Sequence, residues 1–230
     1  MSLQSIINIS NSLSIDRRRL IGIQYSRNEL PRISETPTYN PWKLNVGVPS
    51  SLQYSQARSI LEQLDLLDRR LPEEITFSDN QNLSWMFKYQ GTLTNVQRGQ
   101  VTFNSFTGNE MVLNVSGIVG GSSSSVILDI GDIFQVQGYP YPFTSTTQVL
   151  KGIFSTVTVI THRPNIFWTQ PTAGTDLNWG NDVIFNVFCP NMPTYTLSPG
   201  GYIGNNGTTI NNALIEFSDN FTLYEYLPTA

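Results

Sequence analysis

The stretch from Ser124 to Pro164 limits the possible folds most strongly, because short apolar runs alternate in it with turn residues. Val126, Leu128 and Ile130 alternate along the first run, as expected for a half-buried β-strand. Turn residues separate the runs at Gly131-Asp132, Gly138-Tyr139-Pro140 and Lys151-Gly152. Glycine, proline and aspartate at these points favour tight turns. The stretch therefore predicts consecutive β-strands, and it contains no recognisable catalytic set.

One amphipathic helix is predicted at about residues 52–71. Ser50 and Ser51 offer N-terminal caps, and Pro72 would end the helix. Apolar residues recur between them at spacings of three and four, at Ala57, Ile60, Leu61, Leu64, Leu67 and Leu71. This spacing gives one apolar face. We expect that face to cover a β-sheet.

The rest of the chain from Ile75 onward favours β-structure. A strand is expected over 83–93, and two strands at 101–106 and 111–115 are expected to pair across Gly108. Residues 212–227 are expected to form a hairpin that turns at Asp219-Asn220. One helix among many strands with glycine-rich turns predicts a mainly β fold, a sandwich or a barrel.

The predicted organisation has three parts. Residues 1–50 contain spaced prolines after the run Arg17-Arg18-Arg19, so we expect an extended N-terminal arm with one or two strands. The arm either packs on a neighbouring subunit or forms an ordered surface loop of its own chain. Residues 51–120 and 165–230 are expected to form a β core with the helix. Residues 121–164 are expected to be a small β-module inserted in that core.

Composition narrows the function classes. Charged residues make up only 13% of the chain and the formal net charge is −4. A nucleic-acid surface needs a basic stripe, so nucleic acid is not expected as a surface ligand. The sequence lacks an apolar run long enough for a membrane helix, and residues 1–15 lack the apolar core of a signal peptide. A single cysteine, Cys189, fits assembly in a reducing cytoplasm.

The sequence predicts neither a catalytic residue nor a metal or cofactor site. His162 is the sole histidine, and Cys189 follows an apolar run and resembles a buried small hydrophobe. One histidine and one cysteine do not make a zinc set. The adjacent acids Glu73 and Glu74 cannot face each other across a sugar, and Asp129 and Asp132 flank a turn. We therefore expect a protein that is not an enzyme, and a hydrolase ranks last.

Aromatic residues leave a second function class open. Tryptophans occur at Trp42, Trp85, Trp168 and Trp179, and the chain has ten tyrosines. Such rings stack on sugars, but they also fill sandwich cores and interfaces. A carbohydrate-binding β-sandwich module is thus the alternative hypothesis.

The order of strands and turns also resembles a known module. An aliphatic strand, Gly131-Asp132, a return through Phe143 and Val149, a turn at Gly152 and a β-branched strand ending in Arg163-Pro164 follow one another. This order is similar to the module of bacteriophage distal-tail and baseplate proteins, although arginine and proline are reversed here. Further likenesses lie at Asn40-Pro41-Trp42, 192–197 and 220–225. Together with the single helix they resemble the tail-tube fold, loosely over residues 40–227.

The resemblance implies a virion structural protein of a tailed bacteriophage. Identical subunits would form a ring, six-fold in this family, in the tail or baseplate at the end of the tail tube, and would contact other tail or baseplate proteins. DNA would only pass through the lumen, where negative charge repels it. The protein would be assembled in the host bacterial cytoplasm and reside in the virion tail, without membrane or cofactor. A neck or head-decoration protein is the alternative within the virion.

Two groups of contact residues follow from this resemblance. Arg17, Arg18, Arg19, Tyr25 and Trp42 are predicted to lie at the subunit interface, and the alternative for the arginine run is an exposed basic arm. Residues of the 121–164 module are predicted to contact partner proteins: Asp132, Tyr139, Tyr141 and Arg163.

Overall fold

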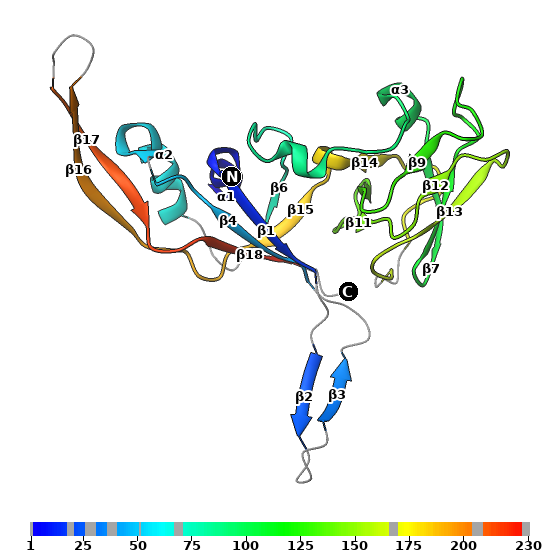
Figure 1. Ribbon diagram of the computed structural model, residues 1–230, viewed down its shortest axis with the longest axis horizontal. Coiled ribbons are helices and arrows are strands. Elements are labelled where there is room, and N and C mark those ends of the chain that lie inside the picture. Colours follow the sequence, from blue (N-terminus) through cyan, green and yellow to red (C-terminus); the bar gives the residue numbers. More distant parts are fainter. Residues whose placement is uncertain are drawn as a thin grey trace. The chain divides into compact units, whose positions relative to one another are not determined.

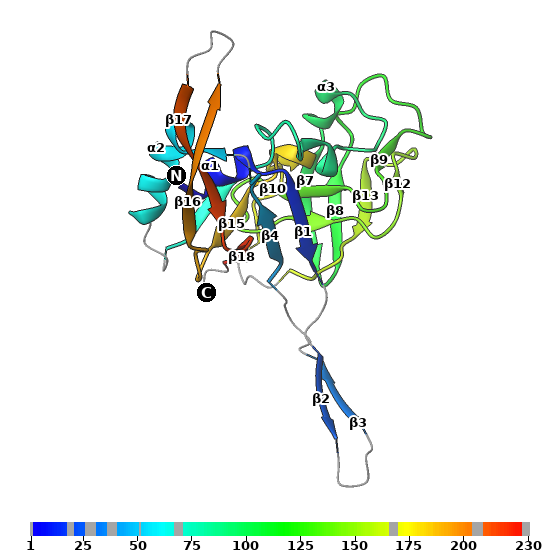
Figure 2. The ribbon, with the colours of Figure 1, turned by 60° about the vertical axis from the view of Figure 1, so that its left-hand side comes forward.

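The computed structural model describes residues 2–17, 21–25, 31–35, 41–50, 52–66, 71–165, 170–203 and 209–226. Their elements are mainly antiparallel β-strands with a few short helices (Figures 1 and 2). This confirms the mainly β prediction, although the described strands do not close into a barrel. The chain divides into two compact units: unit 1 is 1–16, 43–86 and 185–226, and unit 2 is 17–42, 87–184 and 227–230.

Unit 1 is built on a five-stranded antiparallel sheet in the order β1-β4-β18-β15-β6. Its strands are β1 (Ser12–Asp16), β4 (Lys43–Gly47), β18 (Phe221–Glu225), β15 (Phe185–Phe188) and β6 (Glu73–Ile75). Buried residues alternate along β18, because successive side chains of a strand point to opposite faces. Leu44, Val46, Phe221 and Leu223 are thereby buried in one core.

A second sheet and two helices complete unit 1. Strands β16 (Tyr195–Ile203) and β17 (Thr209–Phe217) form a hairpin, and β5 (Leu52–Gln53) pairs with β17. Helix α2 (Tyr54–Asp65) lies beside this hairpin in both views, and α1 (Ser2–Ile9) contacts α2 and β6. The predicted apolar helix face is confirmed where Ala57, Leu61 and Leu64 are buried.

Unit 2 contains three small antiparallel sheets. One joins β13 (Thr156–Ile160), β8 (Glu110–Asn114) and β7 (Thr102–Thr107), and another joins β11 (Phe143–Thr144), β10 (Ile133–Val136) and β14 (Leu177–Trp179). The third pairs β12 (Val149–Leu150) with β9 (Val126–Leu128). Short helices are η1 (Ser84–Phe87), where the units meet in the sequence, α3 (Asn95–Arg98) and η2 (Gly180–Asp182). A separate hairpin is formed by β2 (Ile21–Tyr25) and β3 (Pro31–Glu35).

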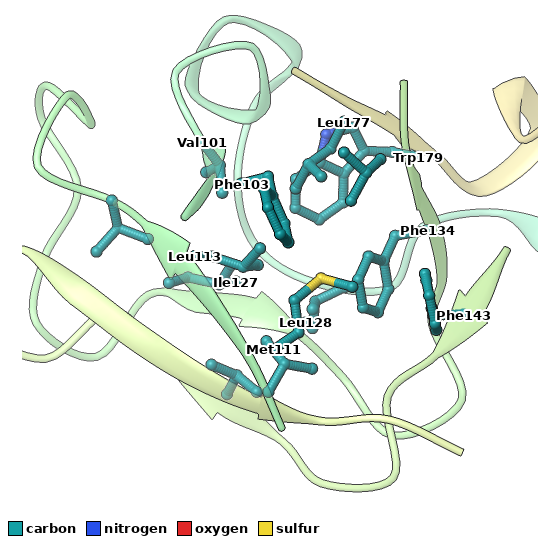
Figure 3. Close-up of a cluster of buried hydrophobic side chains, with 14 of the residues drawn as sticks. Val101, Phe103, Met111, Leu113, Ile127, Leu128, Phe134, Phe143, Leu177 and Trp179 are labelled. Carbon is teal, nitrogen blue, oxygen red and sulfur yellow. The ribbon is translucent and has the colours of Figure 1, made fainter. Parts of the chain in front are cut away.

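The core of unit 2 is aromatic. Side chains from different sheets converge in it (Figure 3), among them Phe103 from β7, Phe134 from β10 and Trp179 from β14. The rings of Phe106 and Phe143 lie 5.1 Å apart between centroids, and those of Phe134 and Trp179 lie 6.4 Å apart. Ring contacts at these distances add to the hydrophobic effect of burial. This core therefore holds the three sheets together as one unit.

The predicted order of strands and turns in residues 101–164 is confirmed. The alternation expected along Val126, Leu128 and Ile130 is wrong, because the strand ends at Leu128 and Ile130 is exposed. β7 and β8 pair across Gly108, and the strands of the 124–164 stretch lie between the predicted turns. Gly131, Gly138 and Gly152 have φ values of 88°, 75° and 59°. Glycine adopts this left-handed region without a Cβ clash, which explains why it stands at these turns.

Several element predictions are wrong. Residues 2–9 form α1 instead of an extended arm, and β1 and β4 belong to the central sheet of unit 1. Residues 83–93 contain the 3₁₀ helix η1 instead of a strand. Helix α2 begins after Gln53, which makes no side-chain cap, and ends at Asp65, so exposed Leu71 is not on its apolar face. Strand β16 continues through Gly200 to Ile203.

The predicted C-terminal hairpin is also wrong. β17 pairs with β16 and β5, whereas β18 pairs with β4 and β15. The chain therefore changes sheets at Asp219-Asn220 instead of folding back on itself. The hydroxyl of Thr222 donates to the side-chain carbonyl of Asn45 at 3.0 Å, a contact between the neighbouring strands β18 and β4, which are far apart in the sequence.

The unit boundaries differ from the predicted organisation. The 121–164 segment is part of unit 2, together with 87–120 and 165–184. The pairing explains this, because β8 pairs with β13 and β10 pairs with β14. A module cut at 121 and 164 would break both sheets.

Candidate functional site

Asp132 is a buried structural acceptor in unit 2. One carboxylate oxygen accepts the N–H of Gln90 at 2.8 Å, and the other accepts the N–H of Asp129 at 2.8 Å. Burial raises the pKa of Asp132, and the backbone donors oppose that shift. With 3% of its surface exposed, Asp132 closes two turns and offers no surface to a partner.

Tyr139, Tyr141 and Arg163 are buried as well. The guanidinium of Arg163 lies 4.2 Å from the ring centroid of Tyr141, and its Nε donates to the carbonyl of Pro142 at 2.9 Å. The hydroxyls of the two tyrosines lie 3.0 Å apart. All four predicted partner-contact side chains thus belong to the interior, which corrects their assignment. A polar residue beside a turn gives the same sequence signal whether it faces inward or outward.

Trp42, predicted at the subunit interface, is buried beside the same arginine. Arg163 lies 4.4 Å from the Trp42 ring centroid and Arg17 lies 5.3 Å from it. Such cation–π contacts stabilise desolvated guanidinium groups. Burial and then the charge of Arg163 lower the pKa of Arg17. In this fold Trp42 therefore holds a cationic cluster, which corrects its placement at an interface.

The structure describes two of the other four residues that were predicted at the subunit interface. Arg17, which follows β1, keeps an exposed surface although its guanidinium is partly desolvated beside Trp42. Arg18 and Arg19 lie outside the described residues. Tyr25 is the last residue of β2, opposite Pro31 in the hairpin.

Two buried amides were missed by sequence reasoning. The Gln135 side chain donates to the carbonyls of Tyr139 at 2.7 Å and Ile184 at 3.0 Å, and it accepts the N–H of Ile184 at 2.9 Å. Asn80 donates to the carbonyl of Ser10 at 3.0 Å and accepts the N–H of Leu83 at 2.8 Å. An Asn within a polar run is a signal for a turn that caps its own backbone. No comparable local signal marks Gln135.

Residues suited to catalysis do not converge in the described part of the chain. The ring of His162 meets that of Trp42 edge-on at 6.3 Å, and Cys189 is buried with its sulfur 3.4 Å from the carbonyl of Asn191. The burial expected of Cys189 is confirmed. The described residues contain no group of three His, Cys, Asp or Glu side chains that could hold a metal ion. None of the described helices is long and apolar enough to cross a membrane.

Sugar stacking has little support among the described tryptophans. Trp42 and Trp179 are buried, and only Trp85 of the three is exposed. A crevice lined by Phe103, Phe106, Tyr139 and Phe143 is too narrow for a water molecule. The buried aromatic rings of unit 2 therefore fill its core. Phe154 is exposed, and Trp168 lies outside the described residues.

Exposed apolar side chains gather instead on three connected segments of unit 2. We call this surface the loop patch: Val96, Val119, Ile153 and Phe154, with Lys151 beside them. Gln97 donates to the carbonyl of Val119 at 3.1 Å, which ties α3 to the loop after β8. The N–H of Gly152 donates to the carbonyl of Ser123 at 2.9 Å, which ties that loop to the β12–β13 connection. The loop patch is thus held by one side-chain and one backbone hydrogen bond, both to backbone carbonyls.

Unit 1 exposes a second apolar surface beside α2. We call it the helix–hairpin patch: Leu66, Tyr195 and Leu197, with the carboxylates of Glu62 and Asp65. The ring of Tyr195 packs edge-on against Phe217 of β17 at 6.1 Å. Burial, followed by Asp65, Tyr54 and Glu62, raises the pKa of Tyr195, so this phenol lies within the field of the helix carboxylates. An acidic rim therefore borders the patch.

No protein-family model matches the chain, and no curated protein matches it either. The function of the chain is consequently inferred from the sequence resemblance and from the geometry of these surfaces.

Proposed function

We propose that the chain is a virion structural protein of a tailed bacteriophage. In this proposal it forms a ring of identical subunits in the tail or baseplate, at the end of the tail tube, and contacts neighbouring tail proteins. The observation that carries it is the pair of exposed apolar patches, one on each unit. Exposed large apolar side chains that gather in one region mark sites of protein contact.

The interior of the chain supports a mechanical role. Buried polar side chains such as Asp132, Gln135 and Asn80 are engaged in hydrogen bonds to the backbone. These hydrogen bonds fix turns, so the polar atoms of these side chains serve to hold the fold. We infer that a protein of this kind acts by binding other proteins through its surface.

Composition and fold are compatible with a place in the tail. Two β-rich units with antiparallel sheets are compatible with the tail-tube type of fold, in which six subunits surround a lumen. The formal net charge of −4 suits a channel that DNA passes without binding, because like charges repel. A neck or head-decoration role would use the same surfaces at another place in the particle.

The purified full chain tests the proposal directly. Native mass spectrometry and negative-stain electron microscopy are expected to detect closed rings whose mass is a multiple of 25.8 kDa. Labelling the chain in intact particles would then locate the ring in the tail, the neck or the head. A chain that remains monomeric at high concentration and binds no tail protein would refute the proposal. Loss of glycan binding on Trp85→Ala, with folding intact, would favour the carbohydrate alternative.

A further inference from the structure

We propose that the loop patch of one copy binds the helix–hairpin patch of the next copy, so that the chain assembles head to tail. This inference rests on the proposed function, because it names the two surfaces that would join neighbouring subunits of a ring. It concerns residues that the sequence resemblance does not single out.

The loop patch has the features of a preformed binding surface. Ile153 and Phe154, which are consecutive, are 88% and 72% exposed. The N–H of Lys151 donates to the carbonyl of Ser125 at 2.9 Å, and the N–H of Val115 donates to the carbonyl of Ser155 at 2.8 Å. These bonds hold the connection from both sides. Little conformational freedom of its backbone is therefore lost when a partner covers it.

The helix–hairpin patch is the matching surface on unit 1. Leu66 is 85% exposed at the end of α2, and Leu197 is 47% exposed on β16. Tyr195 and Leu197 are two residues apart on one strand, so they share a face of the hairpin. Ile215, opposite Leu197 in the register, lies on the same face and is buried.

Charge distinguishes the two patches and sets their pairing. The segments 94–100, 116–125 and 150–155 of the loop patch contain two bases, Arg98 and Lys151, and no acid. The last turn of α2 contributes Glu62 and Asp65 to the other patch, and both are exposed. Two identical patches placed together would bring like charges into contact, which is unfavourable. Unlike patches bring opposite charges together at the rim of an apolar contact.

A second copy of the chain is the occupant that this arrangement favours. Each copy carries both complementary surfaces, on different units, and one contact of this type leaves a free patch of each kind at the two ends. A heterologous contact of this type generates a closed ring or a filament, depending on the rotation between copies. The same contact can therefore repeat from copy to copy, and the proposed function requires that it closes into a ring.

Single substitutions in each patch test the contact in the full chain. Phe154→Asp disables the loop patch, and Leu197→Asp disables the helix–hairpin patch. Each is expected to weaken self-association at least about tenfold in sedimentation equilibrium, as for a central apolar contact. Ile130→Asp is the matched control, because Ile130 is an exposed apolar residue of unit 2 outside the patch. Circular dichroism and thermal unfolding check that every variant is folded.

Mixing the two variants tests the head-to-tail geometry. Phe154→Asp retains the helix–hairpin patch and Leu197→Asp retains the loop patch. The mixture is therefore expected to form a one-to-one dimer that grows no further, while each variant alone is monomeric. A charge exchange tests the rim: Lys151→Glu weakens association, and adding Glu62→Lys and Asp65→Lys restores it.

The outcomes separate the inference from the proposed function. If the wild-type chain assembles and the patch variants assemble equally well, the pairing of these surfaces is wrong and the ring proposal stands. If the wild-type chain stays monomeric at every concentration, both are wrong. If the charge exchange restores the contact between the two patches in a protein that still has the mass of a monomer, the patches bind each other within one chain. That result would overturn the contact between copies.

Discussion

At the scale of the single residue, the buried carboxylate of Asp132 stabilises the fold by accepting backbone hydrogen bonds. Its two oxygens accept the N–H groups of Gln90 and Asp129. Asp132→Asn keeps the size of the side chain but turns an NH₂ group toward one of these donors. We expect a loss of about 1–3 kcal/mol in the free energy of unfolding, the usual cost of a buried unsatisfied donor. Urea denaturation measures it, with exposed Asp182→Asn as the control; equal midpoints for the two variants would contradict this role.

Tyr89 predicts a pH dependence in the alkaline range. Burial raises its pKa from 10.0 to about 12, and its hydroxyl donates to the carbonyl of Ile127 at 2.7 Å. The unfolded chain loses this proton near its ordinary pKa while the folded chain keeps it. The stability contributed by Tyr89 is therefore complete below the ordinary pKa of 10.0. It is lost as the pH rises from there to about 12, the pKa in the folded chain.

The comparison with Tyr89→Phe isolates that contribution. At neutral pH the variant is less stable because the hydroxyl bonds are gone. The gap between wild type and variant is expected to narrow as pH rises from about 10 to about 12. Urea denaturation at each pH measures it. A gap that stays constant over this range would contradict the raised pKa.

The site residues also show which properties of a single residue can be predicted from the sequence and which cannot. Turn glycines can be predicted from the sequence because their backbone conformation requires glycine, and Gly131, Gly138 and Gly152 lie where expected. The burial of a polar residue cannot be predicted in the same way. Tyr141 and Arg163 look like surface residues in the sequence, and only the fold brings Trp42 over the guanidinium.

At the scale of the element, local pairs were predictable and distant pairs were not. β7 and β8 are joined by a short turn, so their sequence contains the whole hairpin. β18 pairs with β4, far along the chain, and nothing near Asp219 indicates that partner. The helix α1 was predictable in part, because Leu3, Ile6 and Ile7 have helical spacing and are all buried.

Asn80 is expected to keep α1 in place. Its amide donates to the carbonyl of Ile7 and to the carbonyl and hydroxyl of Ser10, both at 3.0 Å. Asn80→Ala leaves these acceptors and the N–H of Leu83 without that partner, so we expect about 2–3 kcal/mol of lost stability. Hydrogen exchange should increase in residues 2–10 and 77–83. Gln81→Ala, an exposed neighbour, is the control, and equal exchange in both variants would contradict the role.

At the scale of the whole molecule, unit 2 has what a separate folding unit needs. Its buried apolar cluster comes entirely from residues between Leu93 and Trp179. A continuous fragment of residues 87–184 therefore contains that whole core, although the sequence alone favoured a smaller module at 121–164. The module boundary was missed because strands outside it supply its pairing partners, as β8 does for β13.

We expect the 87–184 fragment to unfold cooperatively, with the near-ultraviolet circular dichroism of packed aromatic rings. It lacks Trp42, whose ring lies 4.4 Å from the Arg163 guanidinium in the full chain. The fragment should therefore be less stable than unit 2 in the full chain, by about 0.5–2 kcal/mol for the cation–π contact and more for lost burial. Trp42→Ala in the full chain should destabilise unit 2 to a similar degree. A fragment without a cooperative transition would mean that the core of unit 2 depends on the rest of the chain.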